Sequence, residues 1–499
     1  MEQHDPAGNS RCIGAFMVAL NETCGGKKWY ISTVQLQLAS VEFCVACRSV
    51  STLHLTVEEG TPRHLWADNW SDKSDARGSS SGGSSDGRSV LVRVPPFRPR
   101  EVTWNLPPSM LSEASIDAFT NLECLSFSDA VERSGDRFDG VALPRGLKSV
   151  VFGRWCYQHV DKVLWAASLK QITFGNKFNR SIKRIVWPTS LERIVFGWNF
   201  NQPVEGVHWP ASLRQLNLGE CFNYPVEEVA WPSPLEELVF PGSFNHPITR
   251  VKWPASLRHL KFGSGFNQPI HQVSWSGSLR KLVFSGKFNQ PIHLVSWPTS
   301  LEMISLGLMF DQPINEVSWP ASLKQLVISG RFNQPIHLVS WPTTLEKMRI
   351  GLLFDQPISE VSWPASLKEL QFLGKFNQPI HLVSWPISLK KVVFGNSFDQ
   401  PINEVSWPVS LKELQFQEKF NQPIHQVSWP TSLKKMFFGN SFDQPINEVS
   451  WPASLKELVI TGKFNQPIHQ VRWPTSLENL VLGDAEATLL STKFNQLRS

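Results

Sequence analysis

The chain has 499 residues, of which 48 are basic and 43 acidic, and its formal net charge is +5. Because these charges are nearly balanced and spread along the chain, the composition excludes the electrostatic footprint of a nucleic-acid-binding protein. Tryptophan and phenylalanine are abundant, with 21 and 32 residues, whereas only 3 tyrosines occur. Such a skew indicates a repeated template rather than an ordinary mixed core.

Residues 1–77 form an N-terminal region of unknown fold. Its longest apolar run, residues 13–20, is too short to span a membrane, and two acidic residues before it argue against a signal peptide. We therefore expect an intracellular, cytoplasmic protein without a membrane partner. Cys44 and Cys47 form a CxxC pair that Cys12 and Cys24 would extend to four thiolates. Their irregular spacing favours reduced cysteines over a zinc site, and we expect no metal and no cofactor.

Two further segments precede the main part of the chain. Residues 78–88 are rich in glycine and serine and read as a flexible linker. Residues 89–137 read as an N-terminal cap, because Leu122, Leu125 and Phe127 form a strand-like LxxLxF pattern near the end of this segment.

A strict repeat occupies residues 138–482. From Phe178 to Phe464 a phenylalanine recurs every 22 residues without an insertion, and a leucine recurs in the same way from Leu147 to Leu477, which makes sixteen leucine anchors. A fixed period of this length predicts a solenoid in which each coil covers the next. The tail, residues 483–499, is interpreted as a C-terminal cap or tail, because Phe494 follows after 30 residues rather than 22.

Each repeat combines a strand and an extended return segment. In the unit 442–463, Leu458 and Ile460 alternate with Glu457 and Val459, which predicts a short strand. The two prolines of each unit exclude a helix from the other half. The sequence therefore predicts a β-rich, leucine-rich-repeat-like solenoid of sixteen 22-residue coils, with one long parallel sheet and helix-poor return segments.

The repeats resemble the FNIP repeat family, a leucine-rich-repeat-like group named for a Phe-Asn-x-Pro-Ile signature. Residues 288–292 read Phe-Asn-Gln-Pro-Ile, and the SLxxLxF strand stands between such signatures at the family's spacing of 22. Asp replaces Asn at positions 311, 355, 399 and 443. Since Asp keeps the side-chain oxygen that can cap a turn, we expect the fold to tolerate this change.

What the resemblance implies about function is protein interaction. FNIP repeats are interaction modules that often stand beside an F-box or another effector domain. Residues 106–108, Leu-Pro-Pro, resemble the start of an F-box only weakly, and the rest of such a domain is not found in the sequence. A substrate-recognition adaptor of a ubiquitin ligase therefore remains an alternative that rests on analogy alone.

Two ladders of side chains have competing interpretations. A tryptophan recurs from Trp165 to Trp473 two residues after an apolar position, which favours packing in the core or at its rim over stacking on a sugar or base. A carbohydrate-binding surface-recognition solenoid is the less favoured alternative that this ladder leaves open. A histidine series, including His293 and His337, lies mostly two coils apart at about 9.6 Å, too far to share one metal ion.

The outward-facing strand positions are where we expect a partner to bind. From Lys347 to Glu457 the position two after the leucine anchor alternates in sign, which predicts cross-strand ion pairs with a structural role. The earlier units vary more and expose apolar residues between charges, as a contact face does. The candidate partner-binding residues are Arg193, Val195, Gln215, Asn217, Glu237, Val239, His259, Lys261, Lys281 and Val283.

Motifs of enzymes are not found in the sequence, since no GxxxxGK, HExxH, GxSxG or kinase set occurs. Acidic residues and histidines recur as ladders and do not converge on one place. We therefore expect no catalytic residues and a non-catalytic scaffold that binds an unidentified protein partner on the parallel-sheet face. A small-molecule ligand is not expected, because no convergent set of polar residues is seen.

Overall fold

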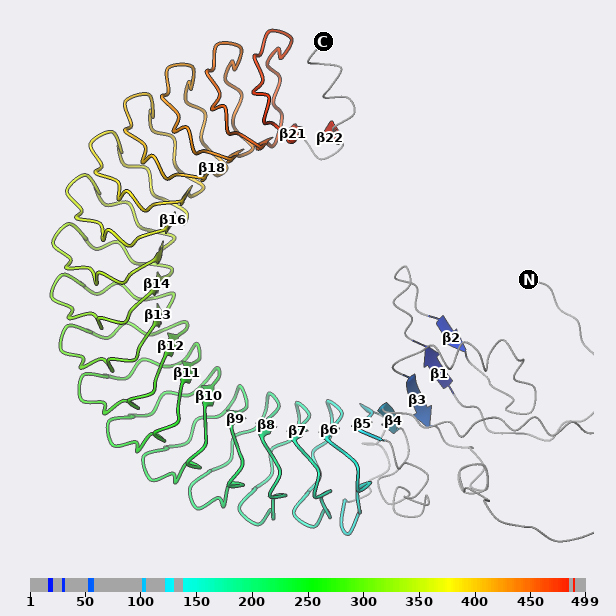
Figure 1. Ribbon diagram of the computed structural model, residues 1–499. Coiled ribbons are helices and arrows are strands. Elements are labelled where there is room, and N and C mark those ends of the chain that lie inside the picture. The colour runs from blue at the N-terminus through cyan, green and yellow to red at the C-terminus, as the bar shows by residue number, and fades with distance from the viewer. Residues whose placement is uncertain are drawn as a thin grey trace, which may run out of the picture. The chain divides into compact units, whose positions relative to one another are not determined.

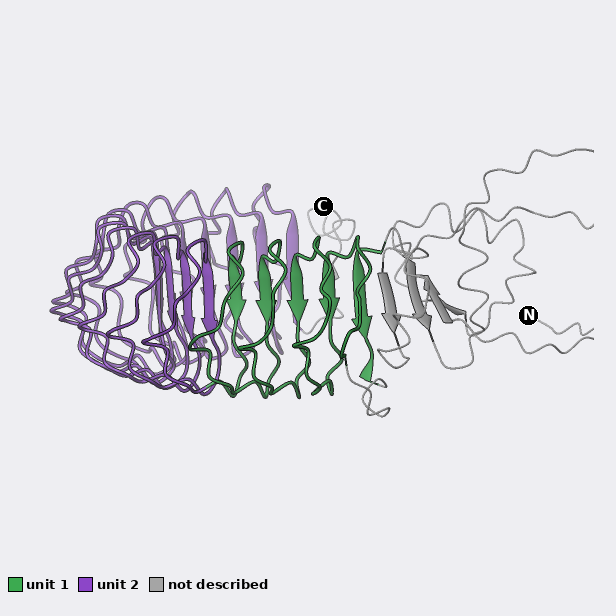
Figure 2. Cartoon of the chain, turned by 90° about the horizontal axis from the view of Figure 1, so that it is seen from below, with its two compact units in different colours: residues 1–222 green, residues 223–499 purple. Residues whose placement is uncertain are grey.

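The computed structural model describes residues 17–20, 29–31, 53–57, 101–104, 122–129, 138–483 and 488–489, and the side chains of residues 122–129 and 138–483. The chain divides into two compact units, residues 1–222 and residues 223–499, coloured green and purple in Figure 2. The division falls inside the repeat tract. Among the described residues the secondary structure consists of strands, turns and a single 3₁₀ position, and no α-helix occurs.

The first unit contains a ladder of short strands. Strand β1 pairs antiparallel with both β2 and β3. From β3 to β9 each strand then pairs in parallel with the next one along the chain. The bounds are β1 Met17–Leu20, β2 Trp29–Ile31, β3 Leu53–Val57, β4 Glu101–Trp104, β5 Cys124–Phe127, β6 Ser149–Val151, β7 Gln171–Thr173, β8 Arg193–Val195 and β9 Gln215–Asn217. The LxxLxF pattern of the expected cap thus contributes β5.

The second unit continues the same plan. Neighbouring strands from β10 to β21 are parallel and pair residues 22 apart, as Glu237 pairs with His259 and His259 with Lys281. Strand β22 runs antiparallel to β21 and pairs with it through Leu489 and Leu480. The bounds are β10 Glu237–Phe240, β11 His259–Phe262, β12 Lys281–Phe284, β13 Met303–Leu306, β14 Gln325–Ile328, β15 Lys347–Ile350, β16 Glu369–Phe372, β17 Lys391–Phe394, β18 Glu413–Phe416, β19 Lys435–Phe438, β20 Glu457–Ile460, β21 Asn479–Leu482 and β22 Thr488–Leu489.

The core lies inside the coils and follows the repeat. In β20, Leu458 and Ile460 are buried while Glu457 and Val459 stay partly exposed, so the alternation predicted from the sequence is confirmed. The phenylalanine of the signature and the apolar residue four positions later are fully buried in most coils, as with Phe288 and Ile292. The parallel solenoid with helix-poor return segments that the 22-residue period predicts is therefore the observed fold, and its described residues contain no α-helix.

Within the second unit the coils fan out away from the strands. Parallel strands are about 4.8 Å apart. The rings of Phe394 and Phe416, at the strand ends, are 5.4 Å apart. The rings of Phe398 and Phe420, deeper in the coil, are 6.1 Å apart. Spacing that grows with depth makes this unit curve with its strands on the inner side, as Figure 1 shows.

The signature asparagine joins one coil to the next. The Oδ1 atom of Asn421 accepts hydrogen bonds from the backbone N–H of Asp443 at 2.9 Å and from Nε2 of Gln444 at 3.1 Å. Where Asp replaces Asn, its Oδ1 atom accepts the same hydrogen bond, as Asp399 accepts one from the backbone N–H of Asn421 at 2.9 Å. Our expectation that the acceptor survives the change is met, but it caps the following coil and not a local turn.

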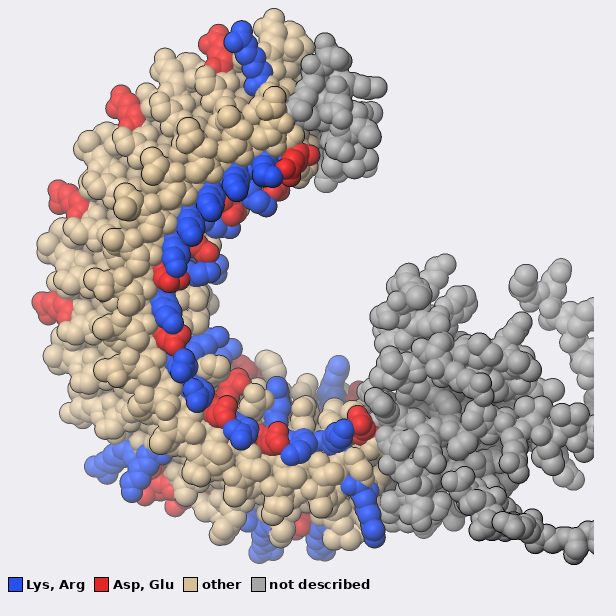
Figure 3. All heavy atoms as spheres, viewed as in Figure 1, with Lys and Arg blue, Asp and Glu red and all other residues tan. Residues whose placement is uncertain are grey.

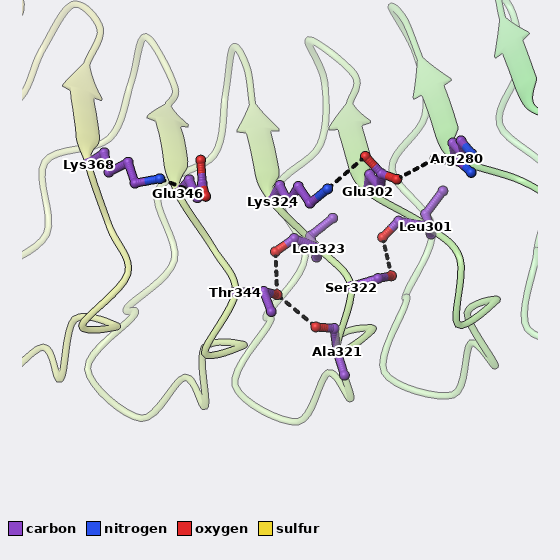
Figure 4. Close-up of polar contacts among 10 residues, drawn as sticks. All are labelled: Arg280, Leu301, Glu302, Ala321, Ser322, Leu323, Lys324, Thr344, Glu346 and Lys368. Carbon is purple, nitrogen blue, oxygen red and sulfur yellow. Dashed lines mark hydrogen bonds and ion pairs between the residues drawn. The ribbon is translucent and has the colours of Figure 1, made fainter. Parts of the chain in front are cut away.

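A second ladder uses the serine that precedes most of the leucine anchors. The hydroxyl of Ser322 donates to the carbonyl oxygen of Leu301 in the previous coil at 2.7 Å (Figure 4). Thr344 takes the place of serine in the next coil and donates to Leu323 at 2.8 Å. Most coils are thus tied to their predecessor at both the signature and the strand entrance, so the return segments need no sheet of their own.

Candidate partner-binding surface

Four of the ten candidate residues lie in the first unit. Arg193 and Val195 belong to β8 and Gln215 and Asn217 to β9, and all four are exposed or partly exposed. Arg193 donates from Nη1 to the Oε1 atom of Gln215 at 3.0 Å. The neighbouring strands bring these four residues into one patch. The guanidinium of Arg193 is already hydrogen-bonded there to the neutral side chain of Gln215.

The other six candidate residues lie together in the second unit. They come from β10, β11 and β12 and line a hollow of about 270 Å³ on the face of the sheet that points away from the buried core. Strand β13 closes the hollow with two residues that the sequence analysis did not select, Met303 and Ser305. The six candidates in the lining are Glu237, Val239, His259, Lys261, Lys281 and Val283.

The hollow combines apolar surface with charges that are not neutralised. Val239, Val283 and Met303 are partly exposed, and His259, Lys261 and Lys281 are exposed. Among the described residues, Lys261 and Lys281 form no salt bridge. Their ammonium groups therefore remain available to a ligand, which makes the hollow a more favourable binding surface than a neutralised strand face.

The later strands differ in this respect. Lys347 pairs with Glu369 at 3.0 Å, Lys391 with Glu413 at 2.7 Å and Lys435 with Glu457 at 2.7 Å. The hydrogen bond with Glu457 raises the pKa of Lys435, and the negative charges of Glu457 and Glu413 act in the same direction. The ion pairs predicted from the alternating signs are confirmed. The lysines and glutamates at this strand position therefore neutralise one another.

A second row of charges escaped the sequence analysis. It occupies the position one residue after each leucine anchor, just before the strand begins. In Figure 4 the carboxylate of Glu302 lies between Arg280, at 2.8 Å, and Lys324, at 3.2 Å. The hydrogen bond from Lys324 is the main cause that lowers the pKa of Glu302, and it outweighs the opposing effect of desolvation. This row becomes visible in the sequence when the residues that directly follow the leucine anchors, 22 residues apart, are compared with one another.

The tryptophan ladder forms part of the wall of the coils. Trp385 and Trp407 are only 9% and 8% exposed, and their rings stack 6.1 Å apart. Their indole N–H groups are buried without a hydrogen-bond partner. A ring whose faces are covered by its neighbours offers no platform to a sugar, so the ladder gives no support to the carbohydrate-binding alternative.

The other candidate chemistry of the sequence finds no site in the described residues. The histidines of the series, such as His293 and His337, are exposed on the return segments. No group of three or more His, Cys, Asp or Glu residues that could hold a metal is found within residues 122–129 and 138–483. Cys12, Cys24, Cys44 and Cys47 lie outside the described residues, and so does the linker at 78–88. In the parts of the chain that were searched, no helix has the length and apolarity needed to cross a membrane.

Comparison with protein families identifies the repeat. The family model for the FNIP repeat matches residues 266–309, 376–419 and 420–462. These three stretches are FNIP repeats. The first matched stretch contains β12 and β13, the second β17 and β18, and the third β19 and β20, together with the signature ladders that tie their coils to the next ones. A comparison with curated proteins found no match.

Solved structures with similar folds are leucine-rich-repeat solenoids. CroV588, described as a novel circular LRR protein, is 29% identical over 76% of this chain and 68% of its own, with a TM-score of 0.50. A chain of the Toll–Spatzle complex from Drosophila is 14% identical over 73% of this chain and 50% of its own, with a TM-score of 0.48. A chain of the TLR13–ssRNA13 complex is 17% identical over 75% of this chain and 54% of its own, with a TM-score of 0.46. The FNIP-repeat chain is thus a leucine-rich-repeat-like solenoid scaffold, a type of fold that generally serves interaction and not catalysis.

Proposed function

We propose that this FNIP-repeat protein is a non-catalytic scaffold that binds a protein partner on the outer side of its parallel sheet, with the hollow over β10–β13 as the anchoring point. The observation that carries the proposal is the contrast between two parts of one sheet. The hollow keeps unpaired lysines around apolar side chains, whereas the strands from β15 to β20 pair their outward charges with one another.

The lining of the hollow suggests the chemistry of the partner. Val239, Val283 and Met303 offer apolar contact area, and Lys261 and Lys281 stand beside it with free ammonium groups. Interfaces commonly join an apolar centre to a polar rim in this way. An apolar side chain of the partner, flanked by carboxylates, would complement the hollow in both shape and charge.

The proposal is tested by reversing the charges of the hollow. The variant Lys261→Glu/Lys281→Glu should lose capture of a partner that the natural protein binds in affinity purification, because like charges would then face the partner's carboxylates. The matched control Lys287→Glu/Lys463→Glu makes the same change of net charge at exposed residues that follow strands β12 and β20 of the same unit. Equal capture by both variants would show that the hollow is not the binding surface.

The adaptor alternative requires an effector-binding domain in residues 1–137. Most of that segment lies outside the described residues, so nothing in the site favours it over simple binding. Affinity purification with and without residues 1–137 separates the two functions. Ligase subunits that disappear with this segment would establish the adaptor, and retention of the same partners without it would leave the scaffold alone.

A further inference from the structure

A row of lysines runs along the second unit just before strands β16–β20. We refer to it as the lysine row, and it consists of Lys368, Lys390, Lys412, Lys434 and Lys456. The backbone N–H of each of the last four donates to the carbonyl oxygen of the one before it at 2.8 Å. This continuous ladder keeps the lysines in line at the spacing of a parallel sheet, about 4.8 Å.

The ends of the lysine row are neutralised and its middle is not. Lys368 pairs with Glu346 at 2.7 Å and Lys456 with Glu478 at 2.5 Å. Lys390, Lys412 and Lys434 are exposed and form no salt bridge among the described residues. The glutamates one residue further along the chain do not neutralise these lysines, because Glu413 and Glu457 are already paired with Lys391 and Lys435.

The same position carries alternating charges earlier in the second unit. Arg280, Glu302 and Lys324 follow one another there, and so do Glu346 and Lys368. Like charges on adjacent strands oppose folding, whereas alternating charges support it. The lysine row therefore departs from the alternation that runs from Arg280 to Lys368, and it is longer than the pair of like charges that Arg258 and Arg280 form at the same position. In Figure 3, Lys and Arg side chains alternate with acidic ones along the strand side of the earlier coils of this unit and form a nearly continuous blue band along the later coils.

We propose that the lysine row is a second binding surface, which holds an extended acidic polypeptide segment running along the stack of coils. Carboxylates of the segment would take the positions that glutamates occupy earlier in the row and would relieve the repulsion among Lys390, Lys412 and Lys434. The row precedes strands β16–β20, whereas the hollow lies over β10–β13, so this proposal stands apart from the proposed function.

The surroundings of the lysine row favour a polypeptide over a nucleic acid. One residue beyond the row, the carboxylates of Glu369, Glu413 and Glu457 recur in every second coil. A nucleic acid carries a charge at every phosphate and could not avoid them. An acidic polypeptide can place its carboxylates over the free lysines and neutral residues elsewhere. Beside the row, the outward position of strands β16–β20 carries Gln371, Val393, Gln415, Phe437 and Val459. Phe437 is therefore the one partly exposed aromatic ring of this position in these strands, whereas successive bases would need several rings to stack on.

The experiment measures binding of a fluorescein-labelled peptide of alternating glutamate and serine to the full chain by anisotropy at low salt. The variant Lys390→Gln/Lys412→Gln/Lys434→Gln should bind about ten-fold more weakly, as three exposed ion pairs would be lost. The control Lys375→Gln/Lys419→Gln/Lys463→Gln removes the same charge from exposed lysines 44 residues apart in the same unit and should bind like the natural protein. The hollow variant Lys261→Glu/Lys281→Glu should also bind normally.

Each outcome decides the proposal. A ten-fold loss confined to the lysine-row variant supports it. No binding by the natural protein, or an equal loss in the control variant, would overturn it, since the row would then be only a solvated face or a part of the net charge. An oligothymidylate of the same charge that binds more tightly than the peptide, and loses affinity in the same variant, would overturn the assignment to a polypeptide.

Discussion

At the scale of single residues, the signature asparagine matters because its oxygen reaches the next coil. In the second unit Asn421 is held by Asp399 and in turn holds Asp443 and Gln444. The acceptor oxygen is common to Asn and Asp, which is why both occur at this position. The amide nitrogen of Asn421 takes no part in this ladder, so Asn and Asp differ there only in charge.

Replacing Asn421 tests this account of the signature. Asn421→Ala should lower the free energy of unfolding by about 1 kcal/mol, because the backbone N–H of Asp443 loses its acceptor. Asn421→Asp keeps the acceptor oxygen. At low pH, where neighbouring carboxyl groups are neutral, it should lower the free energy of unfolding by less than Asn421→Ala does. Urea denaturation followed by circular dichroism measures both. Equal losses for Ala and Asp at low pH would contradict the role of the oxygen.

Glu302 should make stability depend on pH. The hydrogen bond from Lys324, together with Arg280, lowers its pKa from the ordinary 4.5 in the folded state. A lowered pKa contributes stability that is present above the unfolded value and is lost as the pH falls through the folded value. Glu302→Gln should therefore lower the melting temperature near neutral pH, and the difference from the natural protein should disappear in acid.

Melting curves between neutral pH and about pH 3 check this expectation. Glu316→Gln is the control, because Glu316 is exposed on a return segment and forms no salt bridge among the described residues. It should leave the melting temperature nearly unchanged over the same range. A difference between the Glu302 variant and the natural protein that persists in acid would mean that the ion pairs do not stabilise the fold.

At the scale of the coil, the turn after each strand brings backbones into close contact. Gly374 has a φ of 77°, and a Cβ atom there would lie 2.3 Å from the carbonyl oxygen of Leu352 in the previous coil. Gly374→Ala should therefore lower the free energy of unfolding by more than about 2 kcal/mol, through strain and the clash together.

Gly277 provides the matched comparison. It lies in the same unit with no atom within 4 Å of a built Cβ and with no positive φ. Gly277→Ala should be neutral or should raise stability by about 0.4–1 kcal/mol, because alanine restricts the unfolded chain. Denaturation of the two variants side by side measures the contrast. Similar losses at both positions would show that the coils are not stacked as closely as described.

The lysine row allows a stabilising prediction at the same scale. Lys412→Glu would place a carboxylate between Lys390 and Lys434 and restore the alternation seen around Glu302. Stability should rise by a few tenths of a kcal/mol above that of Lys412→Gln, and high salt should reduce the gain. Denaturation at two salt concentrations tests this, and a loss of stability relative to Lys412→Gln would contradict it.

The repeat made the coil predictable and left the contacts between coils harder to read. Leu458 and Ile460 alternate with polar residues, so the strand and its buried face follow from period two. The partners of Asn421 lie 22 and 23 residues away, and a local reading of the signature as a turn cap missed them. The row of Glu302 was missed because only positions inside the strands were considered. Met303 and Ser305 were missed because the hollow extends one strand beyond the varied units.

At the scale of the whole molecule, stacked coils allow one unit to carry separate surfaces. Each coil contacts chiefly its neighbours, so substitutions in distant coils have nearly independent effects. In the second unit the hollow over β10–β13 and the lysine row before β16–β20 therefore form two surfaces that can be altered one at a time. The paired charges of Lys347, Lys391 and Lys435 belong to neither surface and support the sheet itself.

The central claim is that a protein partner binds the outer side of the sheet at the hollow. Photocrosslinking from a benzoylphenylalanine at position 303, in β13 at the edge of the hollow, tests it most directly because it leaves both lysines in place, with position 294 as the control. Leu294 is 67% exposed on the return segment that follows β12. We predict that one partner crosslinks from position 303, and not from 294, and that Lys261→Glu abolishes this product. Crosslinking from 294 alone, or equally from both positions, would contradict the claim.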